Sequence, residues 1–287
     1  MVDALLVRTH FVDAAIRECL DHYQAPGLGL VGLVVDESNG PMETGATPKV
    51  SLTKGAIDDL GLYMEGDAFW RCGDYGLYVA RRKWPEIDNF WLVEWDVRIR
   101  FDHVADFFSL CNSNGAGGAD LLCPWFGPAG HDWYWRAAMA PFRDQIYRCF
   151  VFSIVRLSAR SIDHLLPIRQ RMSQIETAKK FWPNDEVFVA TELMAGGFSC
   201  QDPFSRHGLV TKDSFGCDRP HSERRLLETP NDGKVYHPVR RGDAYFAKAL
   251  QFAKRCPGDA ALLSEDLLLE CGQQRLEEFR ATLSVQA

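Results

Sequence analysis

The sequence predicts an α/β fold with a mainly parallel central sheet flanked by helices. Near-continuous apolar runs of strand length, such as residues 28–35 (LGLVGLVV), alternate along the chain with amphipathic helical segments. Strands that are apolar on both sides are typical of parallel sheets whose two faces are covered by helices. The chain has 287 residues, 46% of them hydrophobic, which is enough for one large domain with a full core.

The first strand, helix and strand are predicted from hydrophobic patterning near the N-terminus. Residues 4–7 form a short apolar run, which predicts a buried strand. Residues 11–23 place apolar side chains on one helical face, and Pro26 with Gly27 ends that helix. Residues 28–35 then form the second strand.

The same alternation continues to residue 194. We expect strands at residues 49–52, 89–99, 120–123 and 149–157, and helices at residues 74–83, 104–111 and 186–194. A further helix begins after Ser158 or Ser161, since either serine can cap its N-terminus. The Gly-rich NGAGGA loop lacks the Gly-Lys-Ser/Thr ending of a phosphate-binding loop and therefore predicts a turn.

The C-terminal part has a different composition. Residues 196–241 are rich in Gly, Pro, Asp, Arg and His, which predicts long loops, and residues 262–283 predict a closing amphipathic helix. We find no internal repeat and no linker that divides the chain. The sequence therefore predicts one domain over residues 1–287.

Charge and cysteine usage exclude several classes of protein. The net charge of −7 argues against binding to duplex nucleic acid, which requires a basic face. No apolar stretch approaches the length of about 18 to 20 residues that a transmembrane helix needs. The N-terminal apolar run contains Asp3 and Arg8 and is not a signal peptide. The nine cysteines show no metal-site spacing and predict reduced thiols in a cytoplasmic protein.

Polar residues at strand ends are the first candidates for a site, because ligands of open parallel sheets bind at the carboxyl ends of the strands. Three sets follow predicted strands or lie late within them: Arg8 with Thr9, Asp36 to Ser38, and Glu94 with Asp96.

Glu94 and Asp96 are two positions apart on a predicted strand, so both side chains are expected on the same face. Two neighbouring carboxylates repel each other, and a divalent cation such as Mg²⁺ or Mn²⁺ would remove that repulsion. The alternative is that Glu94 pairs with Arg98 or Arg100 on the same face and that no metal is involved.

A family resemblance brings these sets together. The segment DYGLYVARRKWPEIDNFWLVEWDVRI resembles the helix and strand that lead to the DxD motif of GT-A-type, nucleotide-sugar-dependent glycosyltransferases. The motif here is Glu94-Trp95-Asp96, with Glu in place of the first Asp. LVVDESNG resembles the second strand of these enzymes, whose terminal acid contacts the nucleotide base or ribose, and the matching residue is Asp36.

Three further motifs follow the same order. ALLVRTH resembles the first strand, which would place Arg8 and Thr9 near the nucleoside. PNDEVFVATELM resembles the helix start that carries the catalytic base of inverting members, matched by Asp185 and Glu186. VYHPV resembles the segment of the C-terminal histidine that completes the metal site, matched by His237. The resemblance covers residues 4–240 and rests on the order of five short motifs.

The resemblance implies a single GT-A-like, Rossmann-like domain. Its nucleotide-binding half would be residues 4–125, its acceptor half with loops residues 126–240, and its terminal helix residues 260–284. It implies inverting transfer of a sugar from a nucleoside-diphosphate sugar, with a UDP-sugar as the first candidate, to a hydroxyl of a glycan or another acceptor.

The implied chemistry assigns a role to each candidate. Mn²⁺ or Mg²⁺, held by Glu94, Asp96 and His237, would stabilise the leaving diphosphate. Glu186 is the preferred general base. Asp185 is the second choice, or instead caps or favours the N-terminus of its helix.

Several side chains have two interpretations each. Asp74 is a candidate nucleotide or donor-sugar contact, and His237 could equally be an ordinary loop histidine. Arginines that could clamp a diphosphate, or could simply be solvated, are Arg219, Arg224 and Arg225. Tryptophans that could stack on a sugar, or could pack in the core, are Trp125, Trp133 and Trp135.

Two other functions stay open on the sequence. A nucleotidyltransferase also uses paired acids and a metal, but the Gly-rich loop expected after its first strand is absent from RTHFVDAA. A non-catalytic protein that binds a carbohydrate or nucleotide on the same fold is the other possibility.

Overall fold

The structure, a computed structural model, describes residues 2–64, 66–149 and 152–284. The chain divides into two compact units, each of which is described by itself. The first unit comprises Met1–Trp95 and Val104–His207, and the second comprises Asp96–His103 and Gly208–Ala287.

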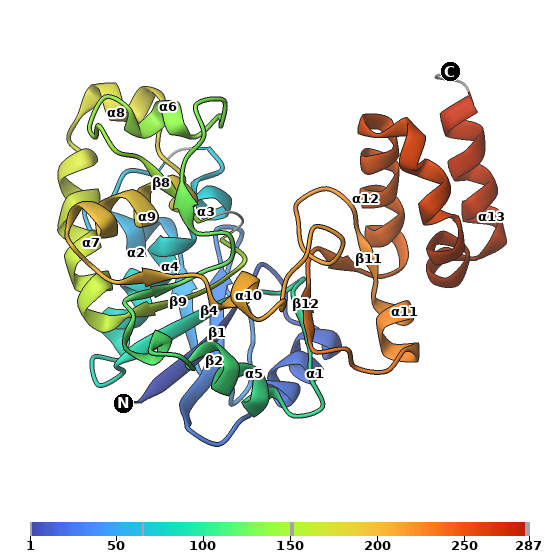
Figure 1. The fold of residues 1–287 in the computed structure, drawn as a ribbon, viewed down its shortest axis with the longest axis horizontal. Helices are drawn as coiled ribbons and strands as arrows, with labels where there is room; N and C mark the ends of the chain where they lie inside the picture. Colours follow the sequence, from blue (N-terminus) through green and yellow to red (C-terminus); the bar gives the residue numbers. More distant parts are fainter. Residues whose placement is uncertain (1, 65, 150–151, 285–287) are drawn as a thin grey trace. The chain divides into compact units, whose positions relative to one another are not determined.

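The first unit is built on a seven-stranded sheet with the order β10-β6-β9-β4-β1-β2-β3 (Figure 1). The strands are β1 (Asp3–Thr9), β2 (Leu28–Asp36), β3 (Lys49–Leu52), β4 (Asn89–Glu94), β6 (Leu121–Leu122), β9 (Ile154–Ser158) and β10 (Cys200–Gln201). Only β9 runs antiparallel to its neighbours in this sheet, and the other pairs are parallel. The predicted α/β class with a mainly parallel central sheet is confirmed.

Helices flank this sheet. They are α1 (Ala14–His22), α2 (Lys54–Asp58), α3 (Ala68–Arg71), α4 (Gly73–Lys83), α5 (Val104–Cys111), α6 (Arg136–Met139), α7 (Ala159–Met172), α8 (Glu176–Lys180), α9 (Asp185–Ala195) and α10 (Pro203–Arg206), with a 3-10 turn η1 (Ala116–Gly118). A two-stranded ribbon pairs β7 (Gly127–Pro128) with β8 (Tyr147–Arg148). Apart from the strand predicted over residues 89–99, the helices and strands predicted for the N-terminal half are confirmed within a few residues.

The core of the first unit occupies both faces of the sheet. On one face, Leu6 and Leu92 belong to the same buried cluster as side chains of α4, α7 and α9. On the other face, Trp91 packs against Phe107 and Phe108 of α5. Side chains alternate between the two faces along β4, so this strand contributes to the hydrophobic core on both sides of the sheet, as expected for a central strand.

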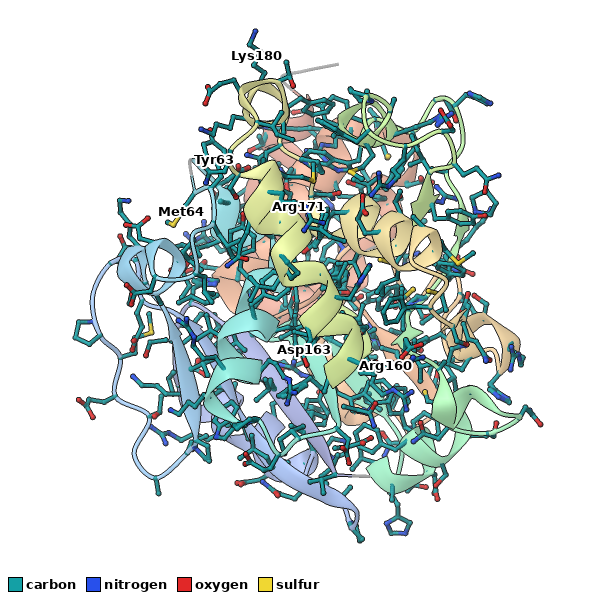
Figure 2. The ribbon with its side chains drawn as sticks, turned by 90° about the vertical axis from the view of Figure 1, so that its left-hand side faces the viewer. Tyr63, Met64, Arg160, Asp163, Arg171 and Lys180 are labelled. Carbon is teal, nitrogen blue, oxygen red and sulfur yellow. The ribbon has the colours of Figure 1, made fainter. Side chains whose placement is uncertain are left out.

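Helix α7 faces the viewer in Figure 2, where Arg160, Asp163 and Arg171 mark its length. Ser158, one of the two predicted caps, accepts a hydrogen bond from the amide of Ser161 and begins this helix. Asp163 forms an ion pair of 3.0 Å with Arg81 of α4, so the two helices are linked at the surface as well as in the core.

The strand predicted over residues 89–99 is two strands, and this prediction is wrong. β4 ends at Glu94, Trp95 and Asp96 form a turn, and β5 (Arg98–Arg100) belongs to the second unit. Just beyond the end of β4, the amide of Trp95 still donates a hydrogen bond to the carbonyl of Arg8 in β1. Glu94 and Asp96 therefore do not share one face of one strand.

The second unit contains short strand pairs and a helical part. β5 pairs with β12 (Lys234–Tyr236), and β11 (His221–Ser222) pairs with β13 (Val239–Arg240). The helices are α11 (Glu223–Glu228), α12 (Gly242–Arg255) and α13 (Ser264–Ser284), with the 3-10 turn η2 (Pro257–Leu263). Tyr245, Ala249 and Leu267 belong to its buried core. The segment predicted as long loops thus contains several short elements, and α12 was not predicted.

Glu270 of α13 organises the second unit. It is 8% exposed and accepts hydrogen bonds from the Ser222 hydroxyl at 2.6 Å and from the amides of Arg224 and Gly242 at 2.8 and 3.1 Å. These amides open α11 and α12, whose first N–H groups lack partners within their own helices. One buried carboxylate therefore caps two helices.

Three remaining sequence predictions concern single segments or residue types. Of the strand predicted over residues 149–157, only the second half is a strand, as β9; residues 152–153 form a turn, and residues 150–151 lie outside the described residues. Five of the nine cysteines are buried: Cys19, Cys72, Cys111, Cys123 and Cys149. Among the described helices, none combines the length and the apolar character that crossing a membrane requires.

Candidate active site

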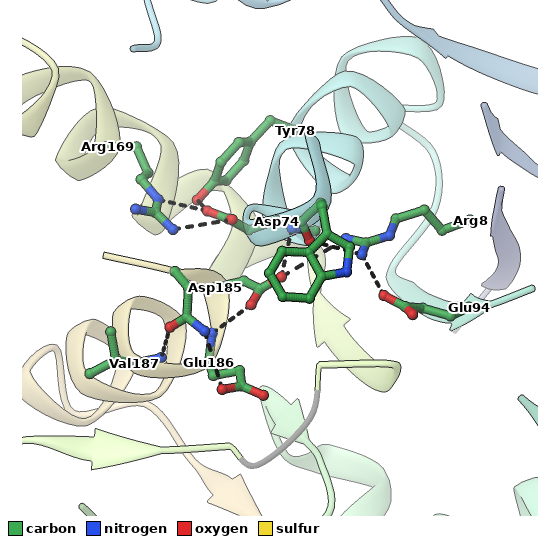
Figure 3. Close-up of polar contacts among 11 residues, drawn as sticks. Arg8, Asp74, Tyr78, Glu94, Arg169, Asp185, Glu186 and Val187 are labelled. Atoms are coloured by element: carbon green, nitrogen blue, oxygen red, sulfur yellow. Dashed lines mark hydrogen bonds and ion pairs between the residues drawn. The ribbon is translucent and has the colours of Figure 1, made fainter. Parts of the chain in front are cut away.

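Arg8 is the centre of a polar cluster at the carboxyl edge of the sheet in the first unit. It forms an ion pair with Glu94, its register partner on the neighbouring parallel strand. The same guanidinium donates to the carbonyl of Trp70 at 3.1 Å and lies 3.9 Å from the carboxylate of Asp185 (Figure 3). One cation thus joins β1, β4 and the first turn of α9.

The two arginines of the alternative pairing have partners within the second unit. Glu94 pairs with Arg8, whereas Arg98 pairs with Glu223 within the second unit. Arg100 donates instead to the carbonyls of Thr229 and Pro230.

Asp185 is buried at the start of α9 and has donors on both oxygens. The amide of Gly73 donates to its Oδ2 at 2.7 Å, and the amide of Glu186 donates to its Oδ1 at 2.8 Å. Burial raises the pKa of the Asp185 carboxyl well above its usual value, and the positive charge of Arg8 offsets this only in part. A buried, fully bonded carboxyl of this kind is poorly placed to accept a proton from an acceptor.

Helix α9 is capped by a residue other than the predicted one. Asn184 precedes the helix, and its side chain accepts a hydrogen bond from the amide of Val187. Asp185 is therefore not the N-cap, but it lies in the first turn of the helix and its Oδ1 accepts from the amide of Glu186, so it can still favour the helix N-terminus.

Glu186, the preferred base, is half-buried in the first turn of α9. The amide nitrogen of Asn184 donates to its Oε2 at 3.1 Å, and the backbone carbonyl of Glu186 accepts from the amide of Cys149. The glutamate is therefore held in place at both ends and is more accessible than Asp185. Its role as a base remains a prediction.

Gly73 lies where no side chain fits. A Cβ at this position would meet the Nη1 of Arg8 at 2.4 Å and the Oδ2 of Asp185 at 2.9 Å. The glycine that opens α4 thus permits the close approach of the Arg8 and Asp185 side chains.

Asp74 is in the core and not at a ligand surface, so its predicted contact with a donor is wrong. It is fully buried, and both of its oxygens accept from Arg169, at 2.8 and 3.2 Å. The hydroxyl of Tyr78 donates to Oδ2 at 2.9 Å. A charged residue next to a glycine and a helix start looks the same in sequence whether its partner is a ligand or an arginine 95 residues away.

Thr9 and Asp36 end the neighbouring parallel strands β1 and β2. The Thr9 hydroxyl is buried and bonds both backbone groups of Phe11, so it shapes the turn after β1. Asp36 is half-buried, and its Oδ1 accepts from the amide of Ser38 at 2.9 Å. Of the two, Asp36 presents its carboxylate more openly for a donor contact, which stays a prediction.

Asp96 and His237 lie together within the second unit. They are 2% and 7% exposed, and the Oδ1 of Asp96 lies 3.6 Å from the Nε2 of His237. The Oδ2 of Asp96 pairs with Arg240, and its backbone carbonyl accepts from Val239 at 2.7 Å. The buried Oδ1 makes no hydrogen bond to any residue in the described part of the chain.

The imidazole of His237 has one nitrogen fixed by the backbone. Its Nδ1 lies 2.5 Å from the carbonyl oxygen of Gly216, which can only accept a hydrogen bond. Nδ1 therefore carries a proton, and in the neutral ring Nε2 presents a lone pair toward Asp96. A carbonyl that orients a histidine in this way is the usual support for a metal ligand.

Two of the three arginines that could clamp a diphosphate are bonded within the second unit. Arg224 donates to the carbonyl of Leu269 at 2.8 Å, and Arg225 pairs with Asp266 at 2.9 Å, so both attach α11 to α13. Both are therefore held on a helix, and the alternative of freely solvated loop charges does not describe them. Arg219 stays a candidate.

The predicted tryptophans are partly buried. Trp133 and Trp135 pack against the core of the first unit, and Trp135 stacks on Phe181. The amide of Trp125 donates to Asp202 at 2.7 Å. By contrast, Trp70 is 69% exposed beside Arg8 and had no sequence signal that distinguished it.

The NGAGGA loop is a turn, as predicted. The buried Arg156 donates to its carbonyl oxygens, at 3.3 Å to Ala116, 3.2 Å to Gly117 and 2.7 Å to Ala119. A loop that turns its carbonyls toward an arginine does not form the cradle of amides that a phosphate requires.

Comparisons with known proteins find distant structural similarity. No protein-family model and no curated protein matches the sequence. The apo structure of mouse xyloside xylosyltransferase 1 matches at 12% identity and a TM-score of 0.39, covering 82% of this chain and 97% of that chain. A glycosyltransferase involved in the glycosylation of the major capsid of PBCV-1 matches at 12% identity and a TM-score of 0.35, covering 82% and 91%. At this distance, function has to be argued from the side chains of this chain.

Proposed function

We propose that the protein transfers a sugar from a nucleoside-diphosphate sugar to a hydroxyl group and uses Mn²⁺ or Mg²⁺ to do so. The observation that carries the proposal is the buried Oδ1 of Asp96, which faces the Nε2 of His237 at 3.6 Å and has no hydrogen-bond donor among the described residues. A buried carboxylate oxygen without a donor costs free energy, and a cation bound between this oxygen and the Nε2 of His237 would remove that cost.

The proposed metal ligands are Asp96, His237 and Glu94. Glu94 is included because it precedes Asp96 by only two residues and ends a strand at the carboxyl edge of the sheet. Oxygen and nitrogen ligands of this kind suit Mn²⁺ and Mg²⁺. When bound, the metal would stabilise the charge that develops on the departing diphosphate.

The other residues have roles that follow from their positions. Asp36, at the end of β2, is proposed to contact the nucleoside, and Thr9 to hold the turn beside it. Arg8 supplies positive charge between Glu94 and Asp185. Glu186, the more accessible acid of α9, is proposed to accept the proton of the acceptor hydroxyl, which assigns inversion to the reaction.

Calorimetry with nucleoside diphosphates tests the proposal. UDP is the first ligand to titrate, with and without Mn²⁺, followed by the other nucleoside diphosphates. The proposal expects Mn²⁺ to raise the affinity for at least one of them. No metal effect on any nucleotide would count against the assigned metal site.

Turnover separates an enzyme from a binding protein. With a nucleotide-sugar that binds, the proposal expects slow release of nucleoside diphosphate and free sugar when no acceptor is present. Release of sugar 1-phosphate and nucleoside monophosphate in their place would indicate nucleotidyl transfer to water. Binding without any turnover would indicate a non-catalytic protein.

A further inference from the structure

Arg169 is a fully buried arginine that contacts both segments of the first unit that carry the Gly73 to Asp185 hydrogen bond. In Figure 3 its guanidinium lies on the far side of Asp74 from Arg8. Its partners are Asp74, which follows Gly73, and residues on either side of Asp185.

On the α4 side, the guanidinium makes a bidentate contact with the carboxylate of Asp74, the residue that follows Gly73. The distances are 2.8 Å from Nε to Oδ2 and 3.2 Å from Nη2 to Oδ1. Such a fork fixes the plane of the carboxylate as well as its position.

On the α9 side, Nη1 donates to the carbonyl of Pro183 at 2.8 Å, two residues before Asp185. The Cζ atom lies 3.6 Å from the ring centroid of Phe188, three residues after Asp185. One side chain of α7 therefore fixes the backbone before Asp185 and the helix face after it.

We propose that Arg169 is a positioning residue of the active site. It fixes the first turns of α4 and α9 relative to each other so that the Gly73 amide meets the Asp185 carboxyl. That hydrogen bond in turn places the carboxyl beside Arg8, and it sets the start of the helix that carries Glu186. The consequence for catalysis rests on the proposed function, whereas the geometric part does not.

Stability alone is a weak reason for this arginine. Burying a charged pair costs desolvation free energy, and well-packed apolar side chains are often at least as stabilising. The fork and the third contact to Pro183 define a geometry that an apolar residue would not. Lysine, with a single ammonium group, would keep the charge but would not reproduce this set of contacts.

Hydrogen exchange of the Gly73 amide tests the geometric part without any substrate. In Arg169→Lys we expect this amide to exchange at least about tenfold faster, the effect of losing one hydrogen bond, while amides in the middle of β1 and β4 keep their protection. Tyr78→Phe is the matched control, because Tyr78 bonds Asp74 within α4, whereas Arg169 also bonds Pro183 before α9. Its Gly73 amide should exchange as in the wild type.

Kinetics test the catalytic part. Arg169→Lys should lower kcat with little change in the KM for the nucleotide-sugar, and Tyr78→Phe should leave both unchanged. If Arg169→Lys does not fold, the double variant Asp74→Asn with Arg169→Met removes both buried charges. Hydrogen exchange and kinetics are then measured on this double variant.

The inference is overturned if the Gly73 amide keeps its protection in the folded arginine variant, or if all core amides lose protection equally. The proposed function and the positioning role of Arg169 can be refuted independently of each other. An inactive wild-type protein with the expected exchange pattern would refute the proposed function alone. Normal kcat together with fast Gly73 exchange would refute the catalytic part of the inference alone.

Discussion

Arg8 and Glu94 form an ion pair at the carboxyl ends of two adjacent parallel strands, β1 and β4. The register of the sheet places them opposite each other, so the pair depends on strand pairing and not on a flexible loop. Asp96 has its own cation in Arg240. The two acids of the Glu94-Trp95-Asp96 motif are therefore each compensated, and the repulsion expected from their spacing is not the reason to propose a metal. The stronger reason is the unbonded Oδ1 of Asp96.

Glu186→Gln tests the assignment of the base. The amide keeps the shape of the side chain and can still contact Asn184, but it cannot accept a proton from an acceptor. We expect sugar transfer to fall by about a hundredfold or more, the usual scale for a general base, while nucleotide affinity stays nearly unchanged. Full activity in this variant, with loss in Asp185→Asn, would move the role to Asp185.

Gly73→Ala tests the close approach at the start of α4. The added methyl group would displace Arg8 or Asp185, since both lie within 3 Å of its expected position. A displacement of about 1 Å in a positioned group can cost roughly a hundredfold in rate. Gly118→Ala is the matched control, because a Cβ there would meet nothing within 4 Å. Equal activity of the two variants would show that Gly73 has no special role.

Asp185 gives the stability of the protein a specific pH dependence. Burial raises the pKa of its carboxyl above the usual 3.8, so the folded protein keeps a proton that the unfolded chain releases as the pH rises. At pH values below the unfolded pKa of 3.8, this proton contributes fully to the free energy of unfolding. The contribution is lost as the pH rises toward and through the pKa of the folded protein.

Asp185→Asn does not titrate and is free of this loss. Its free energy of unfolding, measured by urea denaturation relative to the wild type, should therefore increase between about pH 4 and about pH 7. A difference that stays constant over this range, or that decreases, would contradict the raised pKa.

The two acids of the motif should respond differently to loss of charge. Asp96→Asn removes the charge of a carboxylate whose Oδ1 faces His237, whereas Glu94→Gln acts at the end of β4, where the side chain is bonded to Arg8. We expect Asp96→Asn to weaken metal-dependent nucleotide binding more than Glu94→Gln does. Titrations of both variants with Mn²⁺ and nucleotide measure this, and the reverse order would refute the assignment of Asp96 as the main ligand.

Much of the fold could be predicted because it depends on local patterns. The strand at Lys49–Leu52 and the helix at Val104–Cys111 have the predicted bounds, since hydrophobic period and length determine them. The break after Glu94 was missed because apolar residues continue at Val97 and Ile99, and the end of a sheet depends on its neighbours. Helix α12 has a clear apolar face at Tyr245, Ala249 and Phe252, so its signal was present and overlooked.

The candidate site was less accessible to sequence reasoning. Strand-end patterns indicated Arg8 and Glu94, but their mutual pairing depends on sheet register. The pairing of Asp74 with Arg169 joins residues 95 positions apart and reversed the interpretation of Asp74. Such long-range choices of partner leave no trace in composition or spacing.

The most direct test of the account compares Asp96→Asn with Arg240→Gln. Both break the same ion pair, but only the first removes the charge proposed to bind the metal. Calorimetry should measure the affinity for a nucleoside diphosphate with and without Mn²⁺ in folded samples of each. The account predicts that Mn²⁺ raises the affinity in the wild type and in Arg240→Gln and has no effect in Asp96→Asn. A metal effect of the same size in all three proteins would contradict it.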